Sequence, residues 1–331
     1  MEPLILLTIC ASFFITYLII PYWIRHAKNN GFVSKDMHKI GESSIVGGGG
    51  ISVLFGLSIG ILMYIALKTF YFHSDGESIF IFALLCVVLI SSIVGIIDDL
   101  LGWKKGLPKR LRILIVAFAA IPLMVINAGD STMVLPFIGI TNLGILYPLF
   151  LIPLGIVGTT TTFNFLAGYN GLEASQGILI FIGLTIVTYL TGTAWLSVLC
   201  LYVVATLLAF YIFNFHPARV FPGNVLTYSV GALIATIAIL GNIEKIAVIF
   251  FMPYIIETIL KLRGGLRKES FAKLNSDGSL EIPYDKIYGL EHFAIKILKT
   301  IKKNKKVYEK EVVYFINLIQ ILFIVWGLFT L

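Results

Sequence analysis

Two adjacent carboxylates, Asp98 and Asp99, follow a long run of apolar residues in this 331-residue chain. The helix that this run predicts already carries partial negative charge at its C-terminus, so each carboxylate opposes the helix dipole by roughly 0.3–1 kcal/mol. Adjacent carboxylates also repel each other, and we expect a cation or a shared proton to compensate. Pairing with Lys104, Lys105 or Lys109 is the structural alternative, although these lysines suit an anionic ligand equally well.

A second polar segment, residues 159–164, closes a later apolar run and leads into residues 166–173. The Gly-Tyr and Asn-Gly dipeptides in this stretch predict a tight loop. The amide oxygens of Asn164 and Asn170 suit a hard metal ion, or the reading of a base through paired hydrogen bonds. Helix capping is the ordinary alternative for an isolated asparagine.

A third segment, residues 214–224, contains His216, Arg219 and Asn224 between two apolar runs. Its Pro and Gly residues fix a turn. Asn224 stands at the N-cap of the next predicted helix, where backbone N–H groups and the dipole favour an anion such as phosphate. The glycine run 47–50 would likewise let a ligand approach the backbone closely, although such a run is also typical of flexible chain.

Together these segments offer two carboxylates, several amides, a helix N-terminus and basic side chains. The basic residues in question are Lys39, Arg112, Arg219, Arg267 and Lys268. Such a set suits phosphoryl transfer with Mg²⁺, because the metal and the cations neutralise charge on the phosphate oxygens. A carboxylate can then accept a proton or orient the attacking oxygen.

The elements that must position these residues are strongly apolar. Of all residues 58% are hydrophobic and only 13% are charged, which is more apolar surface than a soluble domain can bury. Each apolar run is close to the ~20 residues that cross a ~30 Å hydrocarbon core. We therefore predict an all-α integral membrane protein of about ten transmembrane helices, forming one domain over residues 1–331. The predicted spans are 3–24, 49–70, 79–97, 111–127, 145–163, 175–191, 194–214, 224–241, 244–261 and 311–331.

The basic residues are distributed unevenly between the loops. If the spans alternate in direction, every Lys and Arg except Lys68 and Lys245 falls on one side. The positive-inside rule makes that side cytoplasmic and puts both termini outside. Residues 263–310, between the last two spans, form the longest cytoplasmic loop. We place the function on this face of the cell membrane, and attribute the lysines at 302–306 to attraction by anionic lipid head groups.

Four segments, in order along the chain, resemble motifs of the polyprenyl-phosphate N-acetylhexosamine-1-phosphate transferases, in glycosyltransferase family 4. Residues 95–99 (Gly-Ile-Ile-Asp-Asp) resemble the paired-aspartate motif after the third helix. Residues 164–173 resemble the Asn-x-Leu-Ala-Gly-x-Asn-Gly-Leu-Glu motif of the eukaryotic and archaeal branch. Residues 216–224 are similar to its Pro-Ser-Arg-Val-Phe-x-Gly-Asp loop, and residues 35–39 to its Asp-Leu-Asn-Lys segment.

The resemblance implies transfer of GlcNAc-1-phosphate from UDP-GlcNAc to dolichyl or another polyprenyl phosphate, which releases UMP and starts a lipid-linked glycan for N-glycosylation or a related process. Asp98 and Asp99 would be the catalytic carboxylates, with Asn164 and Asn224 as ligands of Mg²⁺ or a substituting Mn²⁺. Asn170 would contact uracil, and Arg112 with Lys109 would hold phosphate. The full set implied for substrate binding is Asp36, Lys39, Lys109, Arg112, Asn170, Leu172, Glu173, Arg219, Gly223, Arg267 and Lys268.

Three departures from the family pattern shape these expectations. Asn224 stands where the family has an aspartate metal ligand, and residues 267–270 replace the eukaryotic His-Arg-x-Pro-Arg loop for sugar and pyrophosphate. The His-rich loop of the bacterial muramyl-pentapeptide enzyme is missing. The missing loop argues against UDP-MurNAc-pentapeptide. We favour UDP-GlcNAc as the donor, with another UDP-N-acetylhexosamine or UDP-MurNAc-pentapeptide as the alternative. Residues 167–173 and Asn224 favour an archaeal source.

The expected partners are a UDP-sugar, polyprenyl or dolichyl phosphate and membrane lipids, with no nucleic acid, and a homodimer is left open. A secondary transporter is the competing class of protein, and a non-catalytic scaffold is a weaker one. Transporters place ionisable groups near the membrane midplane, whereas Asp98, Glu173 and Arg219 stand at the ends of predicted spans. An enzyme at the membrane surface is the better interpretation.

Overall fold

The computed structural model describes residues 2–41, 44–74, 76–102, 106–135 and 139–331. It confirms the expected all-α membrane class. Seven of the described helices are long and apolar enough to cross a membrane. They are α1 (Pro3–Asn29), α2 (Gly50–Phe70), α3 (Ser78–Leu101), α7 (Leu172–Leu190), α8 (Ala194–Asn214), α9 (Gly223–Leu240) and α13 (Glu309–Leu328).

The other three predicted spans are shorter or interrupted helices. The fourth consists of α4 (Lys109–Phe118) and α5 (Ile121–Val125), and the ninth consists of α10 (Glu244–Phe250) and α11 (Met252–Arg263). Pro122 and Pro253 lie in the first turns of α5 and α11, where a missing backbone N–H is tolerated but a continuous helix is broken. In the fifth predicted span, the π-helix η1 (Tyr147–Leu151) continues into the α-helix α6 (Ile152–Phe163). The count of ten crossings stays a prediction.

Short antiparallel hairpins and one further helix complete the described structure. The hairpins are β1 (Val33–Lys35) with β2 (Ser44–Val46), β3 (Thr132–Leu135) with β4 (Gly139–Asn142), and β5 (Lys273–Leu274) with β6 (Leu280–Glu281). Residues 263–310, expected as a long loop, carry β5, β6 and the helix α12 (Leu290–Ile301).

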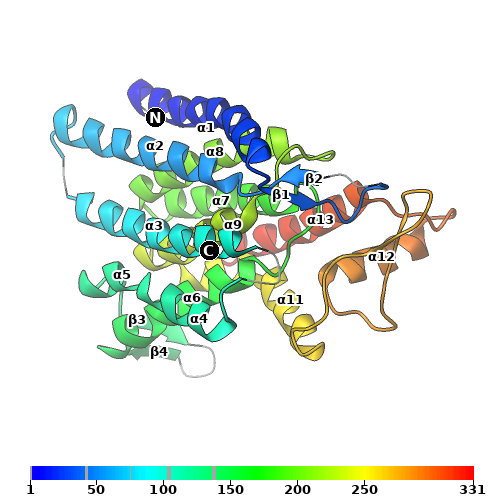
Figure 1. The fold of residues 1–331 in the computed structure, drawn as a ribbon. Helices are drawn as coiled ribbons and strands as arrows, with labels where there is room; N and C mark the ends of the chain where they lie inside the picture. The colour runs from blue at the N-terminus through cyan, green and yellow to red at the C-terminus, as the bar shows by residue number, and fades with distance from the viewer. Residues whose placement is uncertain (1, 42–43, 75, 103–105, 136–138) are drawn as a thin grey trace.

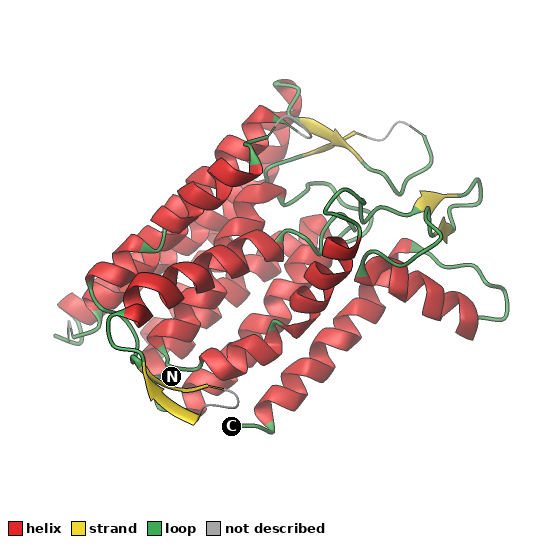
Figure 2. Ribbon diagram, turned by 90° about the horizontal axis from the view of Figure 1, so that it is seen from below, coloured by secondary structure: helices red, strands yellow, loops and turns green. Residues whose placement is uncertain are grey.

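The long helices run side by side, with the β1–β2 hairpin and α12 at one end of the bundle (Figure 1). The two termini and the β3–β4 hairpin lie toward the opposite end (Figure 2). The loops that carry the sequence motifs therefore gather at the end of the bundle away from both termini.

Helix α9 is the centre of the packing and contacts α2, α3, α6 and α7. Small residues allow this close approach. A Cβ atom on Gly95 of α3 would lie 2.6 Å from the carbonyl oxygen of Asn224, and one on Gly231 of α9 would lie 2.6 Å from that of Thr159 in α6. These two contacts bring the C-terminal part of α3 against the start of α9, and the C-terminal half of α6 against the middle of α9.

Candidate active site

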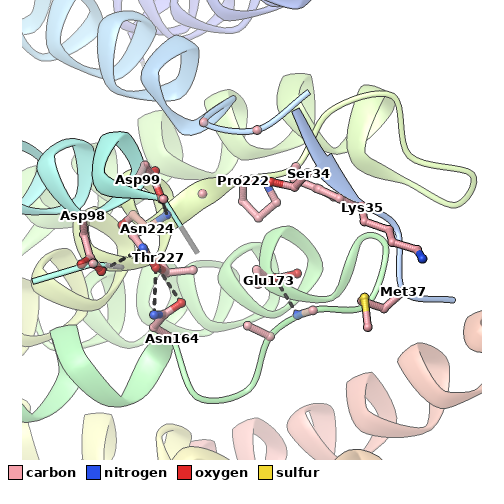
Figure 3. Close-up of a pocket in the computed structure, with 18 of the residues that line it drawn as sticks. Ser34, Lys35, Met37, Asp98, Asp99, Asn164, Glu173, Pro222, Asn224 and Thr227 are labelled. Atoms are coloured by element: carbon pink, nitrogen blue, oxygen red, sulfur yellow. Dashed lines mark hydrogen bonds between the residues drawn. The ribbon is translucent and has the colours of Figure 1, made fainter. Parts of the chain in front are cut away.

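A cavity of about 1010 Å³ opens among the loops at the end of the bundle that is away from the termini. All four sequence motifs contribute to its lining, together with the chain that follows α3 and α11 (Figure 3). This volume suits a large organic ligand. The predicted site residues that line it are Asp36, Asp98, Asp99, Arg112, Asn164, Glu173, Gly223 and Asn224.

Asp98 is the more deeply buried of the two adjacent carboxylates, with 4% of its surface exposed. Its Oδ1 accepts hydrogen bonds from the backbone N–H of Leu107 at 2.7 Å and from Nη2 of Arg112 at 3.0 Å. Its Oδ2 lies 2.9 Å from the same Arg112 nitrogen. Arg112 therefore compensates the charge of Asp98 within the described structure. The alternative partners Lys104 and Lys105 and the side chain of Lys109 lie outside the described residues.

Asp99 is stabilised by the N-terminus of α9. Its Oδ1 accepts a hydrogen bond from the backbone N–H of Asn224 at 2.8 Å, and its Oδ2 accepts one from that of Val225 at 3.2 Å. Gly223 makes this approach possible because it has a φ of +73° and because a Cβ atom there would collide with the Asp99 carboxylate. The predicted anion site at this helix N-terminus is filled by a carboxylate of the protein itself.

Amide side chains connect Asp98 to the end of α6. Nδ2 of Asn224 donates to Oδ2 of Asp98 at 3.0 Å, and Nδ2 of Asn164 donates to Oδ1 of Asn224 at 2.9 Å. The hydroxyl of Thr227, one turn into α9, donates to Oδ1 of Asn164 at 3.2 Å. The residues predicted as catalytic and as metal ligands thus form one hydrogen-bonded group at one end of the cavity (Figure 3).

The opposite wall of the cavity comes from the loops after α1 and α6. Asp36, with 2% of its surface exposed, accepts a hydrogen bond from Nδ2 of Asn170 at 3.2 Å. Glu173 accepts one from the backbone N–H of Gly168 at 2.9 Å, which closes the turn of the 164–173 motif. Tyr169, in this turn, is 2% exposed, and burial raises the pKa of its phenol well above the usual value.

Several predicted residues lie elsewhere. Arg219, Arg267 and Lys268 are exposed and do not belong to the described lining of the cavity. Lys268 instead places its ammonium 4.7 Å from the ring centre of Tyr284. Lys39 lines a smaller neighbouring hollow, 3.5 Å from Asp36.

Two further predicted residues support the cavity without lining it in the described structure. Leu172 is fully buried in the hydrophobic core. Asn170 is 4% exposed and does not belong to the described lining of the cavity, but it donates a hydrogen bond to Asp36, which does. The predicted uracil contact of Asn170 stays a prediction, because in this structure its side chain holds the wall rather than facing the space.

Lys261 and Thr227 are among the polar lining residues that the sequence-based prediction missed. Lys261, at the end of α11, donates through Nζ to the backbone oxygen of Phe165 at 2.5 Å and to the hydroxyl of Ser270 at 2.7 Å. Among the described residues, the cations that line the cavity are Lys35, Arg112 and Lys261. Lys261 stands at the end of a predicted span, near the expected sugar loop, and this position could have indicated that it belongs to the site. Thr227 carries no comparable signal, because threonine is common within such helices.

The apolar bundle and its acidic, amide-rich cavity define a multi-pass membrane protein with a polar site at one end. Residues 81–242 match the model of glycosyl transferase family 4. A protein of Saccharolobus solfataricus, provisionally named UDP-N-acetylglucosamine–dolichyl-phosphate N-acetylglucosaminephosphotransferase, is 35% identical over 88% of each chain. A protein of Sulfolobus acidocaldarius with the same provisional name is 31% identical over 89% of this chain and 88% of the relative. The Dictyostelium discoideum enzyme of that name is 27% identical over 73% of this chain and 67% of its own. The chain belongs to glycosyl transferase family 4.

Proposed function

We propose that this protein transfers GlcNAc-1-phosphate from UDP-GlcNAc to dolichyl phosphate or a related polyprenyl phosphate. An oxygen of the lipid phosphate attacks the phosphorus that carries the sugar, the bond from that phosphorus to the oxygen of UMP breaks, and UMP leaves. The names of the relatives support the choice of donor and acceptor. The observation that carries the proposal is the convergence of Asp98, Asp99, Asn164 and Asn224 at one end of a cavity of suitable size.

The two carboxylates have different capacities to act on a substrate. Asp98 is surrounded by donors from Leu107, Arg112 and Asn224. Asp99 accepts one backbone hydrogen bond at each oxygen, and each oxygen of a carboxylate can accept two. Asp99 therefore has more capacity left to orient the lipid phosphate or to accept a proton from it, while Asp98 holds Arg112 and Asn224 in place.

Arg112 and the N-terminus of α9 supply positive charge to this end of the cavity. The Arg112 guanidinium is 26% exposed and remains accessible beside Asp98, so it can also contact a phosphate oxygen. Charge that develops on the transferred phosphoryl group is stabilised by such fixed donors because they need no rearrangement during the reaction.

The donor set also fits a magnesium ion. Two carboxylates and two amide oxygens are the hard oxygen ligands that Mg²⁺ prefers, and Asp98, Asp99, Asn164 and Asn224 would hold it. When bound, the ion neutralises charge on the diphosphate oxygens. The amide of Asn224 makes the site one charge less negative than the aspartate of the family motif would.

We further propose that the cavity faces the cytoplasm, where a nucleotide sugar is available. The basic residues of the loops around it, judged by the positive-inside rule, support this orientation. Both termini would then lie outside.

The experiment that tests the function is an assay of purified protein with Mg²⁺, polyprenyl phosphate and one of three donors. The donors are UDP-GlcNAc, UDP-GalNAc and UDP-MurNAc-pentapeptide. We expect equal amounts of UMP and lipid-linked GlcNAc pyrophosphate from the first donor. Faster transfer from one of the other two would assign a different sugar, and no transfer from any of them would contradict the proposal.

A further inference from the structure

The first residue of α13, Glu309, is a buried carboxylate outside the described lining of the cavity, with 4% of its surface exposed. We propose that Glu309 is a positioning residue for the donor substrate, because its hydrogen bonds fix the cavity wall opposite Asp98. The proposal rests on the proposed function and adds a residue that none of the sequence motifs contains. Figure 3 shows the two ends of the cavity, with Asp98 at one and Lys35 and Met37 at the other.

The carboxylate of Glu309 joins three separate loops. Its Oε1 accepts a hydrogen bond from the backbone N–H of Asn170 at 2.7 Å, and Nδ2 of Asn170 lies 3.3 Å from Oε2. Nδ1 of His216 lies 2.9 Å from Oε2, and Nδ1 of His38 lies 3.5 Å from Oε1. The loops after α1, α6 and α8 are therefore tied to the start of α13 by one side chain.

These contacts act on residues that do line the cavity. Nδ2 of Asn170 also donates to Asp36 at 3.2 Å, and the ring of His38 lies against that of Tyr169, with 4.3 Å between the ring centres. Asp36 and Tyr169 both face the space. Loss of the Glu309 carboxylate would thus displace Asp36 through Asn170, and Tyr169 through His38.

A metal site is the competing interpretation, because ligand atoms of Asp36, His38 and Glu309 all lie within 4.8 Å of one another. The hydrogen bonding of His38 argues against it. The backbone N–H of Ala272 donates to Nε2 of His38 at 3.2 Å, so Nε2 has the lone pair and we assign the proton to Nδ1. A histidine that binds a metal normally donates from its other ring nitrogen, whereas here that nitrogen accepts. The Nδ1 proton of His38 instead faces Glu309.

The wall held by Glu309 suits the donor rather than the lipid. It is built from loops that extend beyond the helix ends, and the polar residues Asp36, Tyr169 and Glu173 belong to its lining. A substrate with its reacting phosphate at Asp98 and Asp99 would place its remote part against this wall. The remote part of the nucleotide sugar is polar, while that of the polyprenyl phosphate is a hydrocarbon that belongs in the bilayer.

The test is a comparison of Glu309→Gln with Glu311→Gln in the full-length purified protein. Glu311 lies two residues further along α13, is more exposed, and pairs with Lys302. Asn170, His216 and His38 now approach two carboxylate oxygens of Glu309. A glutamine at this position has only one acceptor oxygen, so at least one of these donors loses its partner. We expect the KM for UDP-GlcNAc to rise about tenfold in Glu309→Gln. The kcat and the KM for polyprenyl phosphate should change less than about twofold, and Glu311→Gln should match the wild type.

A second variant, His216→Phe, removes one donor to Glu309 at a partly exposed position. It should raise the same KM by a smaller factor, which keeps the test decisive if Glu309→Gln is poorly folded. Calorimetric binding of UDP-GlcNAc gives a readout that does not need turnover. If the wild type binds UDP-GlcNAc more tightly than Glu309→Gln does but transfers no GlcNAc-1-phosphate, the proposed function fails and the positioning role of Glu309 stands.

Three results would overturn the positioning role. The first is an unchanged KM and binding affinity for UDP-GlcNAc in both variants. The second is a loss of kcat with an unchanged KM, which would make Glu309 part of the chemical step. The third is a transition metal that is present in equimolar amount in the wild type and absent from Glu309→Gln, measured by mass spectrometry of the purified proteins.

Discussion

The carboxylate of Asp99, at the C-terminal end of α3, accepts a hydrogen bond from the backbone N–H of Asn224, at the N-terminal end of α9, at 2.8 Å. A carboxylate at the end of α3 alone would oppose the dipole of its own helix. Here it lies at the positive end of a second helix, which reverses the sign of the interaction. The contact fixes the end of the cavity that contains Asp98 and Asp99 by joining two helices that are far apart in sequence.

Replacement of Asp99 by asparagine should remove most of the activity. The amide has nearly the same shape but cannot accept a proton or carry a negative charge, so we expect kcat to fall at least about 100-fold. Asp285→Asn, an exposed carboxylate in the loop before α12, is the matched control and should retain full activity. UMP release measures both, and thermal unfolding shows whether Asp99→Asn is folded. A folded variant with normal activity would remove Asp99 from the mechanism.

Replacement of Asn224 by aspartate should lower the Mg²⁺ concentration needed for half-maximal activity, by roughly tenfold. The new carboxylate adds a negative charge beside Asp98, where Nδ2 of Asn224 now donates at 3.0 Å, and the added attraction for the cation is worth about 1–4 kcal/mol. Without Mg²⁺ the same change should lower the unfolding temperature, because two carboxylates then repel each other. Asn304→Asp, in an exposed loop, is the control. Identical Mg²⁺ titrations for Asn224→Asp and the wild type would show that Asn224 is not a ligand.

Replacement of Gly223 by alanine should reduce both stability and activity. The left-handed φ of +73° costs a residue with a side chain roughly 1–2 kcal/mol, and the new Cβ would push Asp99 away from α9. Gly155→Ala is the matched control, because a Cβ atom there meets open space within a helix. Thermal unfolding and UMP release should separate the two variants. Equal behaviour would mean that the approach of Asp99 to α9 does not depend on this glycine.

The stability of the protein should depend on pH through His292 in α12. Burial lowers the pKa of this histidine to about 4, from a usual value of 6.5. Below pH 6.5 the unfolded chain therefore binds a proton that the folded protein does not, and stability is lost as pH falls from 6.5 through about 4. His292→Phe should reduce this loss in thermal unfolding between pH 7 and pH 4, and His26→Gln, at an exposed position, is the control.

The pH dependence of stability must be compared between variants, because a second buried group in α12, Glu291, changes it in the opposite direction. Burial and the neighbouring Glu257 raise the pKa of Glu291 well above its usual value. The contribution of Glu291 to the stability of the folded protein is therefore lost as pH rises. The difference between His292→Phe and the wild type isolates the histidine. An unchanged pH profile in His292→Phe would mean that His292 does not remain neutral in the folded protein.

The sequence was sufficient for properties that depend on nearby residues. Apolar runs of membrane length predicted the helical membrane class, and the local motifs predicted that Asp98, Asp99, Asn164 and Asn224 belong to one site. These features follow from composition and spacing over a few turns of chain. The breaks at Pro122 and Pro253 were not predicted, because a proline in an apolar run does not always interrupt a helix: Pro21 lies inside the continuous α1.

The tertiary structure decided which side chains meet. Arg267 and Lys268 were the expected cations of the sugar loop, but the path of the chain after α11 exposes them and turns Lys261 toward the cavity. Glu309 is 139 residues from Asn170 and belongs to no motif. A single carboxylate in a sequence gives no indication of its partners, because they are set by the packing of α13 against the helices around it. The sequence by itself determined the kinds of groups at the site, and only the packing of the bundle determined which of them hold the wall and which face the cavity.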